Sequence, residues 1–227
     1  MPSLKISSGS DAFDSFLEGG YEKDIVTTLY GPPGSGKTTL CMLASISQAR
    51  DRKKVIYIDT EGGFSLERMQ QLAGSEFDSL FSYIVLLKPT TFEEQDKGLK
   101  KLKDMVSPKI GLIVVDTMTI FYRLELALDK GIRKANNKLI WQVSYLNEIA
   151  RKNGIPVIAT NQVYSDFKNR DEVKMVGGDI LKYSSKCLIS LKSLARNKRK
   201  AVIISHRSIP EGKEEDFAII NEGIIEA

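Results

Sequence analysis

Histidine and cysteine are scarce in this chain of 227 residues, and their scarcity excludes several kinds of chemistry. His206 is the single histidine, so we expect neither catalysis by imidazole nor a histidine-rich metal site. Cys41 and Cys187, the two cysteines, lie far apart in apolar surroundings and lack the spacing of metal ligands. We interpret both as reduced residues of the core.

Long apolar runs are absent as well. No stretch approaches the roughly 18 apolar residues that a membrane-spanning helix requires. The N-terminal segment MPSLKISSGSD also lacks the basic and then apolar layout of a secretory signal. We therefore expect a cytoplasmic protein that does not contact a membrane.

The composition is that of a chain that folds. Hydrophobic residues make up 42% and charged residues 27%, which is ordinary for a globular protein and far from the composition of disordered chains. A length of 227 residues suits one α/β domain with a single large core. We therefore expect a single domain that spans residues 1–227.

The basic residues are unevenly distributed. The formal net charge is only +4, from 33 Lys and Arg against 29 Asp and Glu. Residues 192–207, KSLARNKRKAVIISHR, nevertheless contain six Lys or Arg and no acid. Such a cluster is either a solvated turn or an anion-binding patch, and composition alone leaves both interpretations open.

Short β-branched runs alternate with longer helical patterns along most of the chain. The expected strands are 24–30, 54–59, 83–87, 110–116 and 155–160. Strands that are apolar on both faces and separated by helices predict a mostly parallel sheet with helices on both faces. After about residue 185, SSKCLISLKSL, RKAVIIS and DFAIIN follow one another without helices. We interpret these three runs as antiparallel strands added to one edge of the sheet.

Residues 137–154 show the apolar stripe of a helix that packs on this sheet. The stripe consists of Leu139, Val143, Leu146 and Ala150, three or four positions apart. Asn153 and Gly154 form a stop signal, and Pro156 lies just beyond it. We expect the helix to end there.

Residues 31–39 read GPPGSGKTT and lie between an expected strand and an apolar helical pattern. They fit the phosphate-binding pattern G-x-x-x-x-G-K-[ST] at Gly31, Gly36, Lys37 and Thr38. Glycines allow backbone N–H groups to surround an anion, and the start of the following helix adds further donors and its dipole. Lys37 would reach the terminal phosphates of ATP, and the Thr38 hydroxyl would bind Mg²⁺. The predicted nucleotide-binding residues are Gly31, Pro32, Pro33, Gly34, Ser35, Gly36, Lys37, Thr38 and Thr39.

Two of the expected strands end in carboxylates. Asp116 ends the strand 110–116, and with the phosphate loop present we expect it to hold Mg²⁺ beside Thr38. Alone, an aspartate at the end of a strand is as typical of a cap on the next helix. Asp59 and Glu61 follow the strand 54–59, and the carboxyl ends of such strands face the ligand. Glu61 is our candidate for the group that orients or deprotonates the attacking water, whereas Asp59 is open to a role as a turn cap.

Several motifs resemble those of the RecA-like recombinases of archaea and eukaryotes. They are YIDTEGGFSLER, LIVVDTMTIFYR, PVIATNQV and GGDILKYSS, in the same order and at similar spacing. The similarity extends from SGSDAFDSFLEGG to FAIINEGI, nearly the whole chain. It implies a RecA-like P-loop ATPase core that binds ATP and Mg²⁺ and acts on DNA in homologous recombination and repair, in association with the nucleoid.

The resemblance also implies roles for two residues that the phosphate loop does not include. Arg68 would pack on the adenine of the nucleotide. Gln162, at the end of PVIATNQV, would sense the γ-phosphate and relay its presence to the DNA-binding loop that follows. Together with Lys37 and Glu61, Gln162 completes the predicted catalytic set.

Two segments match the positions of the family's DNA-binding loops, namely 126–138 and 163–178. Their basic groups suit phosphates, and their aromatic rings suit stacking on unpaired bases. The predicted DNA-binding residues, including the basic stretch, are Arg133, Lys134, Tyr164, Phe167, Lys168, Arg170, Lys174, Arg196, Lys198, Arg199 and Lys200. The alternative interpretation is that these are surface loops whose charges are merely solvated.

One departure from the family bears on assembly. Full-length recombinases of this kind carry an N-terminal helical DNA-binding domain and a linker with a Phe-x-x-Ala segment, and these 227 residues contain neither. We therefore expect a monomer or small oligomer rather than a long filament. The implied partners are single-stranded or junction DNA, the main recombinase and a Holliday-junction nuclease.

Three functions stay open on the sequence. The first is a weak DNA-associated ATPase, and the second is a mediator for which ATP is only a conformational ligand. The third is a signalling ATPase similar to the KaiC-like relatives, without a role on DNA.

Overall fold

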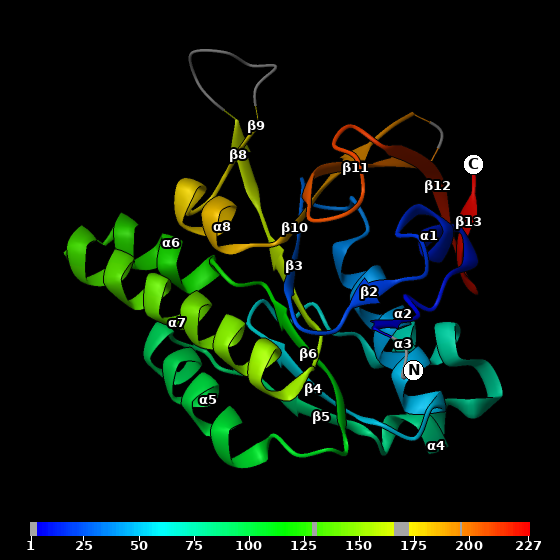
Figure 1. The fold of residues 1–227 in the computed structure, drawn as a ribbon, viewed down its shortest axis with the longest axis horizontal. Coiled ribbons are helices and arrows are strands. Elements are labelled where there is room, and N and C mark those ends of the chain that lie inside the picture. Colours follow the sequence, from blue (N-terminus) through cyan, green and yellow to red (C-terminus); the bar gives the residue numbers. More distant parts are fainter. Residues whose placement is uncertain (1–3, 129–130, 166–172, 196) are drawn as a thin grey trace.

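The computed structural model describes residues 4–128, 131–165, 173–195 and 197–227. Among these residues, nine strands form one central sheet (Figure 1). In spatial order they are β13 (Gly223–Glu226), β12 (Glu214–Ile220), β11 (Lys198–His206), β10 (Cys187–Ser193), β3 (Val26–Tyr30), β7 (Val157–Asn161), β6 (Ile110–Asp116), β4 (Lys54–Asp59) and β5 (Ile84–Leu87). Two small antiparallel pairs stand apart, β1 (Lys5–Ile6) with β2 (Tyr21–Glu22) and β8 (Val163–Ser165) with β9 (Val173–Met175).

The sheet is mostly parallel, as the sequence predicts. The six strands from β10 to β5 run parallel, and β11, β12 and β13 add antiparallel pairs near the C-terminus. One detail of the prediction is wrong, because β10 lies parallel to β3 and is antiparallel only to β11. To run parallel to β7 and β3, β10 needs a crossover connection after β7. The segment that includes helix α8 (Gly178–Ser184) supplies that connection just before β10.

Helices cover both faces of the sheet (Figure 1). One face packs against α1 (Asp11–Phe16), α2 (Lys37–Arg50), α3 (Leu66–Ala73) and α4 (Phe77–Phe81), with the 3-10 turn η1 (Gly74–Glu76) between the last two. The other face packs against α5 (Phe92–Met105), α6 (Ile120–Ala127), α7 (Ile132–Asn153) and α8. Alternate residues of β4 divide between the two cores, which explains why that strand is apolar throughout.

Several local predictions are confirmed. The four predicted stripe residues of α7 are buried, and the helix ends at Asn153 because Gly154 adopts the left-handed conformation at φ 60°. Cys41 and Cys187 are free and buried. In the described part of the chain, no helix combines the length and apolarity needed to cross a membrane.

The direction of the parallel strands gives the sheet two distinct ends. At the carboxyl end, β3 leads into the loop 31–36, and β4, β6 and β7 finish beside it. At the amino end, β3 and β10 begin next to Asp24 and Lys186. Each end carries a cavity.

Candidate functional site

The phosphate loop lies between β3, near the middle of the sheet, and α2. Gly36 precedes α2 with φ 100°, a conformation that favours glycine. A Cβ atom at Gly31 would lie 2.2 Å from the carbonyl oxygen of Leu191 on β10. Glycine is therefore required at Gly31 because the neighbouring strand passes too closely for any side chain.

Lys37 is the positive centre of the loop. Its Nζ donates hydrogen bonds to the carbonyl oxygens of Gly31 at 2.8 Å and Pro32 at 2.9 Å. Burial lowers the pKa of Lys37, and the nearby carboxylates of Asp116 and Glu61 oppose that shift. The loop thus folds around a buried ammonium group that can offset the charge of phosphates.

Asp116 is buried at the end of β6 and accepts hydrogen bonds from three hydroxyl groups. Thr38 Oγ1 and Tyr57 OH each donate to Oδ2 at 2.8 Å, and Thr160 Oγ1 donates to Oδ1. The peptide bond between Asp116 and Thr117 is cis. The pairing of a carboxylate with the Thr38 hydroxyl provides the oxygen donors that Mg²⁺ prefers.

Glu61 lies beside Gln162, although the two residues are 101 positions apart in the chain. Gln162 Nε2 donates a hydrogen bond to Glu61 Oε1 at 2.5 Å, and Thr117 Oγ1 lies 3.5 Å from the same oxygen. Burial, and then the charge of Asp116, raise the pKa of Glu61, while Lys37 opposes the shift. A carboxylate with a raised pKa is a better proton acceptor near neutral pH.

Asp59 caps the turn that follows β4 and does not face the cavity. Its carboxylate accepts hydrogen bonds from the backbone N–H groups of Gly63 at 3.0 Å and Phe64 at 3.2 Å. This contact caps the turn after β4 and leaves Glu61 as the carboxylate of that turn that faces the cavity.

These groups line one cavity of about 370 Å³ at the carboxyl end of the sheet. Its lining comprises Pro33, Gly34, Gly36, Lys37, Thr38, Thr39, Glu61, Asp116, Thr117, Gln162 and Ile219. The structure therefore brings together the predicted phosphate, metal and water-activating residues. The donor set fits a nucleotide with Mg²⁺: a glycine-rich loop, a buried ammonium group, and a hydroxyl beside a carboxylate. Among the described residues no group of three or more His, Cys, Asp or Glu is placed to hold a metal ion.

Comparisons with known proteins agree with this geometry. The Rad51 family model matches residues 2–227. The "DNA repair and recombination protein RadB" of Methanobrevibacter smithii is 40% identical over 227 residues, which cover 97% of this chain and 95% of the relative. The chain belongs to the RadB group of the Rad51 family. This confirms the resemblance to RecA-like recombinases.

Two further matches are also described as RadB proteins. The protein of the same description from Methanoculleus marisnigri is 40% identical and covers 99% of both chains. A solved structure described as "Crystal structure of the RadB recombinase" has a TM-score of 0.83 and 37% identity. It covers 98% of this chain, and this chain covers 99% of it. Sequence and fold therefore match over essentially the whole length.

Arg68 does not line the cavity. Its guanidinium, on α3, donates hydrogen bonds to the carbonyl oxygens of Ile220 at 2.8 Å and Asn221 at 3.0 Å. These carbonyls form the turn between β12 and β13, next to Ile219 in the cavity wall. Arg68 therefore holds this wall in place, and its contact with adenine stays a prediction.

The predicted DNA-binding residues fall into two groups. Arg133 and Lys134 are exposed in the first turn of α7, and Tyr164 on β8 is 47% exposed. Phe167, Lys168, Arg170 and Arg196 lie outside the described residues, as does the side chain of Lys174 on β9. DNA contact by this set stays a prediction.

The basic stretch on β11 has contacts of its own. Lys200 forms ion pairs with Glu214 and Asp216 on β12. Arg199 Nε donates a hydrogen bond to the carbonyl oxygen of Gly34 in the phosphate loop at 3.1 Å. Much of this charge is therefore engaged within the protein, and Arg199 connects the stretch to the loop 31–36 at the carboxyl end of the sheet.

Sequence reasoning missed four residues of the site: Tyr57, Thr117, Thr160 and Ile219. For two of them a signal was present, because Tyr57 and Thr160 stand near the carboxyl ends of expected strands beside that of Asp116. Ile219 gave no such signal, because it reaches the cavity through the antiparallel extension of the sheet.

Proposed function

We propose that this chain is an ATP-binding, DNA-binding protein that acts in homologous recombination and DNA repair and hydrolyses ATP weakly. The observation that carries the proposal is the convergence of Lys37, Thr38, Asp116, Glu61 and Gln162 on one cavity. The curated relatives named as DNA repair and recombination proteins support the same field of action. We assign the chain a role as mediator or regulator of the main recombinase or of Holliday-junction processing.

Each group has a definite task in binding and hydrolysis. Lys37 and the backbone N–H groups of the loop offset the phosphate charge. Thr38 and Asp116 would hold Mg²⁺, which would neutralise charge that develops on the phosphates. Glu61 orients a water molecule and accepts its proton.

The contact between Glu61 and Gln162 fixes one side of the carboxylate. The Gln162 amide donates a hydrogen bond to Glu61 Oε1 at 2.5 Å. A carboxylate has two oxygens, and either one can accept a proton from water. We infer that Gln162 orients Glu61 in the site.

Gln162 also connects the cavity to the predicted DNA-binding segment. Its carbonyl oxygen accepts the N–H of Val176 at 3.1 Å, and the side chain of its neighbour Asn161 donates to the Val176 carbonyl at 2.8 Å. Strands β8 and β9 lie in the chain between Gln162 and Val176, so these two contacts hold the base of the strand pair. A γ-phosphate that binds the Gln162 amide would shift one of these contacts, and so bias the strand pair between two arrangements.

DNA binding measured with ATP, with ADP and without nucleotide, across a salt series, tests the proposal. We expect affinity for single-stranded or junction DNA to depend on the nucleotide and to fall by orders of magnitude from low to moderate salt. Absence of salt-dependent DNA binding would contradict a role on DNA and favour a signalling ATPase. Absence of multiple-turnover phosphate release would leave the mediator that only binds ATP.

Assembly is tested separately. We propose a monomer or small oligomer, measured by sedimentation with ATP and DNA. Long nucleoprotein filaments in electron micrographs would contradict this part of the proposal and leave the nucleotide site unaffected.

A further inference from the structure

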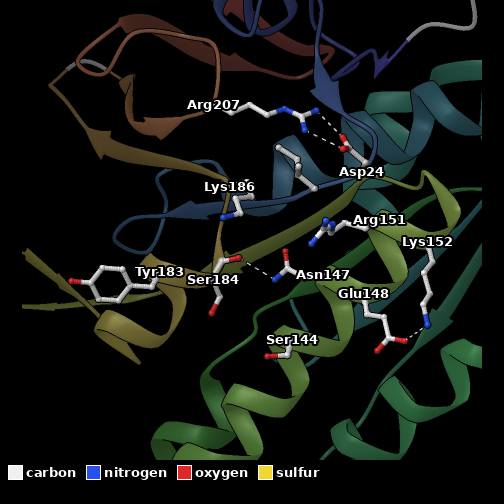
Figure 2. A pocket seen from close by; sticks show the side chains of 11 residues that line it. Asp24, Ser144, Asn147, Glu148, Arg151, Lys152, Tyr183, Ser184, Lys186 and Arg207 are labelled. Carbon is white, nitrogen blue, oxygen red and sulfur yellow. Dashed lines mark hydrogen bonds and ion pairs between the residues drawn. The ribbon is translucent and has the colours of Figure 1, made fainter.

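A second cavity, of about 1020 Å³, lies at the amino end of the sheet. Its walls come from the segment before β3, the second half of α7, the end of α8, and the residues that flank β10 and β11 (Figure 2). The lining residues are Asp24, Ile25, Ser144, Asn147, Glu148, Arg151, Lys152, Tyr183, Ser184, Lys186 and Arg207. None of them belongs to the nucleotide cavity.

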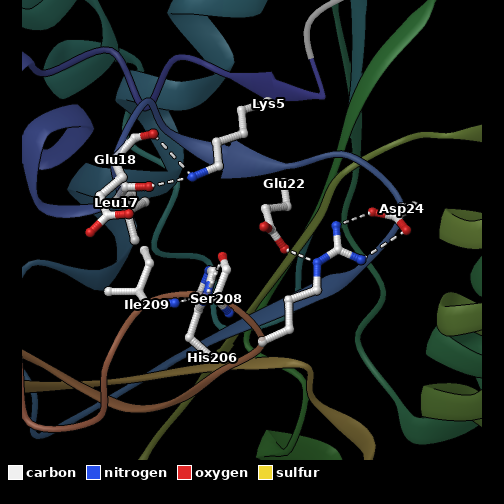
Figure 3. A network of polar contacts seen from close by, with 9 residues as sticks. Lys5, Leu17, Glu18, Glu22, Asp24, His206, Ser208 and Ile209 are labelled. Atoms are coloured by element: carbon white, nitrogen blue, oxygen red, sulfur yellow. Dashed lines mark hydrogen bonds and ion pairs between the residues drawn. The ribbon is translucent and has the colours of Figure 1, made fainter.

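Two of the four basic residues in this lining are neutralised by carboxylates. Arg207 binds Asp24 at 2.7 Å and 3.0 Å (Figure 2), and its Nε lies 2.6 Å from the buried Glu22. Figure 3 labels the two carboxylates, Glu22 and Asp24. Lys152 forms an ion pair with Glu148 at 2.5 Å. These ion pairs hold Arg207 and Lys152 in place and neutralise most of their charge, so neither is the main attraction for an anionic ligand.

Arg151 and Lys186 remain without such partners. Within the described part of the chain, neither side chain makes a hydrogen bond or an ion pair. They come from different elements, Arg151 from α7 and Lys186 from the segment before β10 (Figure 2). Both side chains are exposed and line the same cavity, so their charges are available to an anion that enters it.

The rest of the lining adds donors and rigidity. Asn147 Nδ2 donates to the carbonyl oxygens of Val143 and Ser184, both at 3.0 Å, and so holds the end of α8 against α7. The Ser144 hydroxyl lines the same cavity and is exposed. Guanidinium and ammonium groups are donors only, so Arg151 and Lys186 favour a ligand with several acceptor oxygens.

The helix dipole accounts for the position of Arg151 but not for that of Lys186. Arg151 lies in the last turn of α7, where a basic side chain stabilises the negative end of the helix dipole. Lys186 lies outside both helices, since α8 ends at Ser184. The helix dipole therefore does not account for the charge of Lys186 at this cavity.

We propose that this cavity binds a phosphate group held between Arg151 and Lys186. A planar guanidinium fork and an ammonium group together match the several oxygens of a phosphate better than one carboxylate does. The phosphate can belong to a free phosphate compound or to a DNA strand, and the chemistry of recognition is the same. This site needs no nucleotide binding at the carboxyl end.

The first experiment uses the full chain saturated with a non-hydrolysable ATP analogue and Mg²⁺, so that the carboxyl end is filled. Inorganic phosphate is then titrated by calorimetry into wild type, into the double variant Arg151→Gln with Lys186→Gln, and into a control, Lys88→Gln with Lys101→Gln. The control removes two exposed lysines elsewhere and changes the net charge equally. We expect phosphate affinity to fall about tenfold or more in the first variant only.

The second experiment distinguishes the source of the phosphate. Single-stranded DNA is titrated into the same three proteins across a salt series. Loss of affinity with a flatter salt slope in the Arg151 and Lys186 variant alone identifies a DNA phosphate, whereas unchanged DNA binding with weakened phosphate binding identifies a free compound.

A third experiment uses NMR on the wild-type protein and needs no variant. The Arg151 Nε–H resonance should shift when phosphate or DNA is added in the presence of the analogue. No shift with either ligand, or equal affinities in all three proteins for both ligands, would overturn the proposal.

Discussion

At the carboxyl end of the sheet every charged side chain of the cavity has a partner, whereas at the amino end Arg151 and Lys186 have none among the described residues. The difference follows from the direction of the strands. A helix begins after β3 at the carboxyl end, so backbone N–H groups and the positive end of a dipole face the ligand. At the amino end α7 and α8 terminate, so only side chains can attract an anion there.

The two ends of the sheet would therefore bind phosphate in two different ways. The carboxyl end uses backbone geometry, needs glycines, and tolerates little change. The amino end uses two long side chains on a rigid wall and should be altered easily without loss of the fold. Variants at one end should therefore leave the other unchanged.

Glu61→Gln should have the largest effect, on the rate of hydrolysis. Glutamine cannot accept the proton of water, so we expect the rate to fall about 10²–10⁴-fold while ATP affinity is retained. Phosphate release under multiple turnover measures this. The matched control is Arg151→Gln with Lys186→Gln, and an equal loss of rate there would break the separation of the two ends.

Lys37→Ala should come next, because it removes the buried ammonium group that faces the phosphates. Loss of the charge-assisted bonds that Lys37 would make to phosphate oxygens predicts about 100-fold weaker ATP binding by calorimetry, with the fold intact. The phosphate site at the amino end should keep its affinity. Unchanged ATP binding in the folded variant would contradict the assignment of the phosphate loop.

Gln162→Ala should separate two properties that wild type links. ATP binding and DNA binding should each persist, but the difference in DNA affinity between the ATP and ADP forms should disappear. A coupling of about 1–3 kcal/mol is typical of such linked sites, or about 5–150-fold in affinity. Glu61→Gln, by contrast, should preserve the difference. If the Gln162 variant keeps the difference in full, the chain is better described as a static adaptor.

The smallest effect concerns stability and pH without nucleotide. The pKa of Glu61 is raised in the folded protein by burial, so its folding contribution is fully present below the ordinary pKa of glutamate and is lost as pH rises through the raised value. Glu61→Gln should therefore increase the free energy of unfolding slightly at pH 7 relative to wild type. Urea unfolding at pH 7 and near pH 4 measures this, and an equal gain at both values would argue against the raised pKa.

Much of the fold could be predicted from the sequence because it depends on the local pattern of apolar and polar residues. Apolar β-branched runs separated by helical stripes predicted the parallel sheet, and Gly154 predicted the end of α7. The orientation of β10 was not readable, since Cys187–Ser193 has the same pattern in a parallel or an antiparallel pair. Only the crossover through α8 decides it.

The sequence by itself determined the chemistry of the carboxyl end, because a strand, a glycine-rich loop and a helix are consecutive in the chain and need no distant partner. Tertiary structure alone decided which distant groups meet there: Gln162 beside Glu61, and Tyr57 and Thr160 on Asp116. It also decided the amino end, where Arg151 and Lys186 line one cavity although no motif links them. Contacts between residues far apart in sequence depend on how strands are ordered in the sheet, and local pattern does not encode that order.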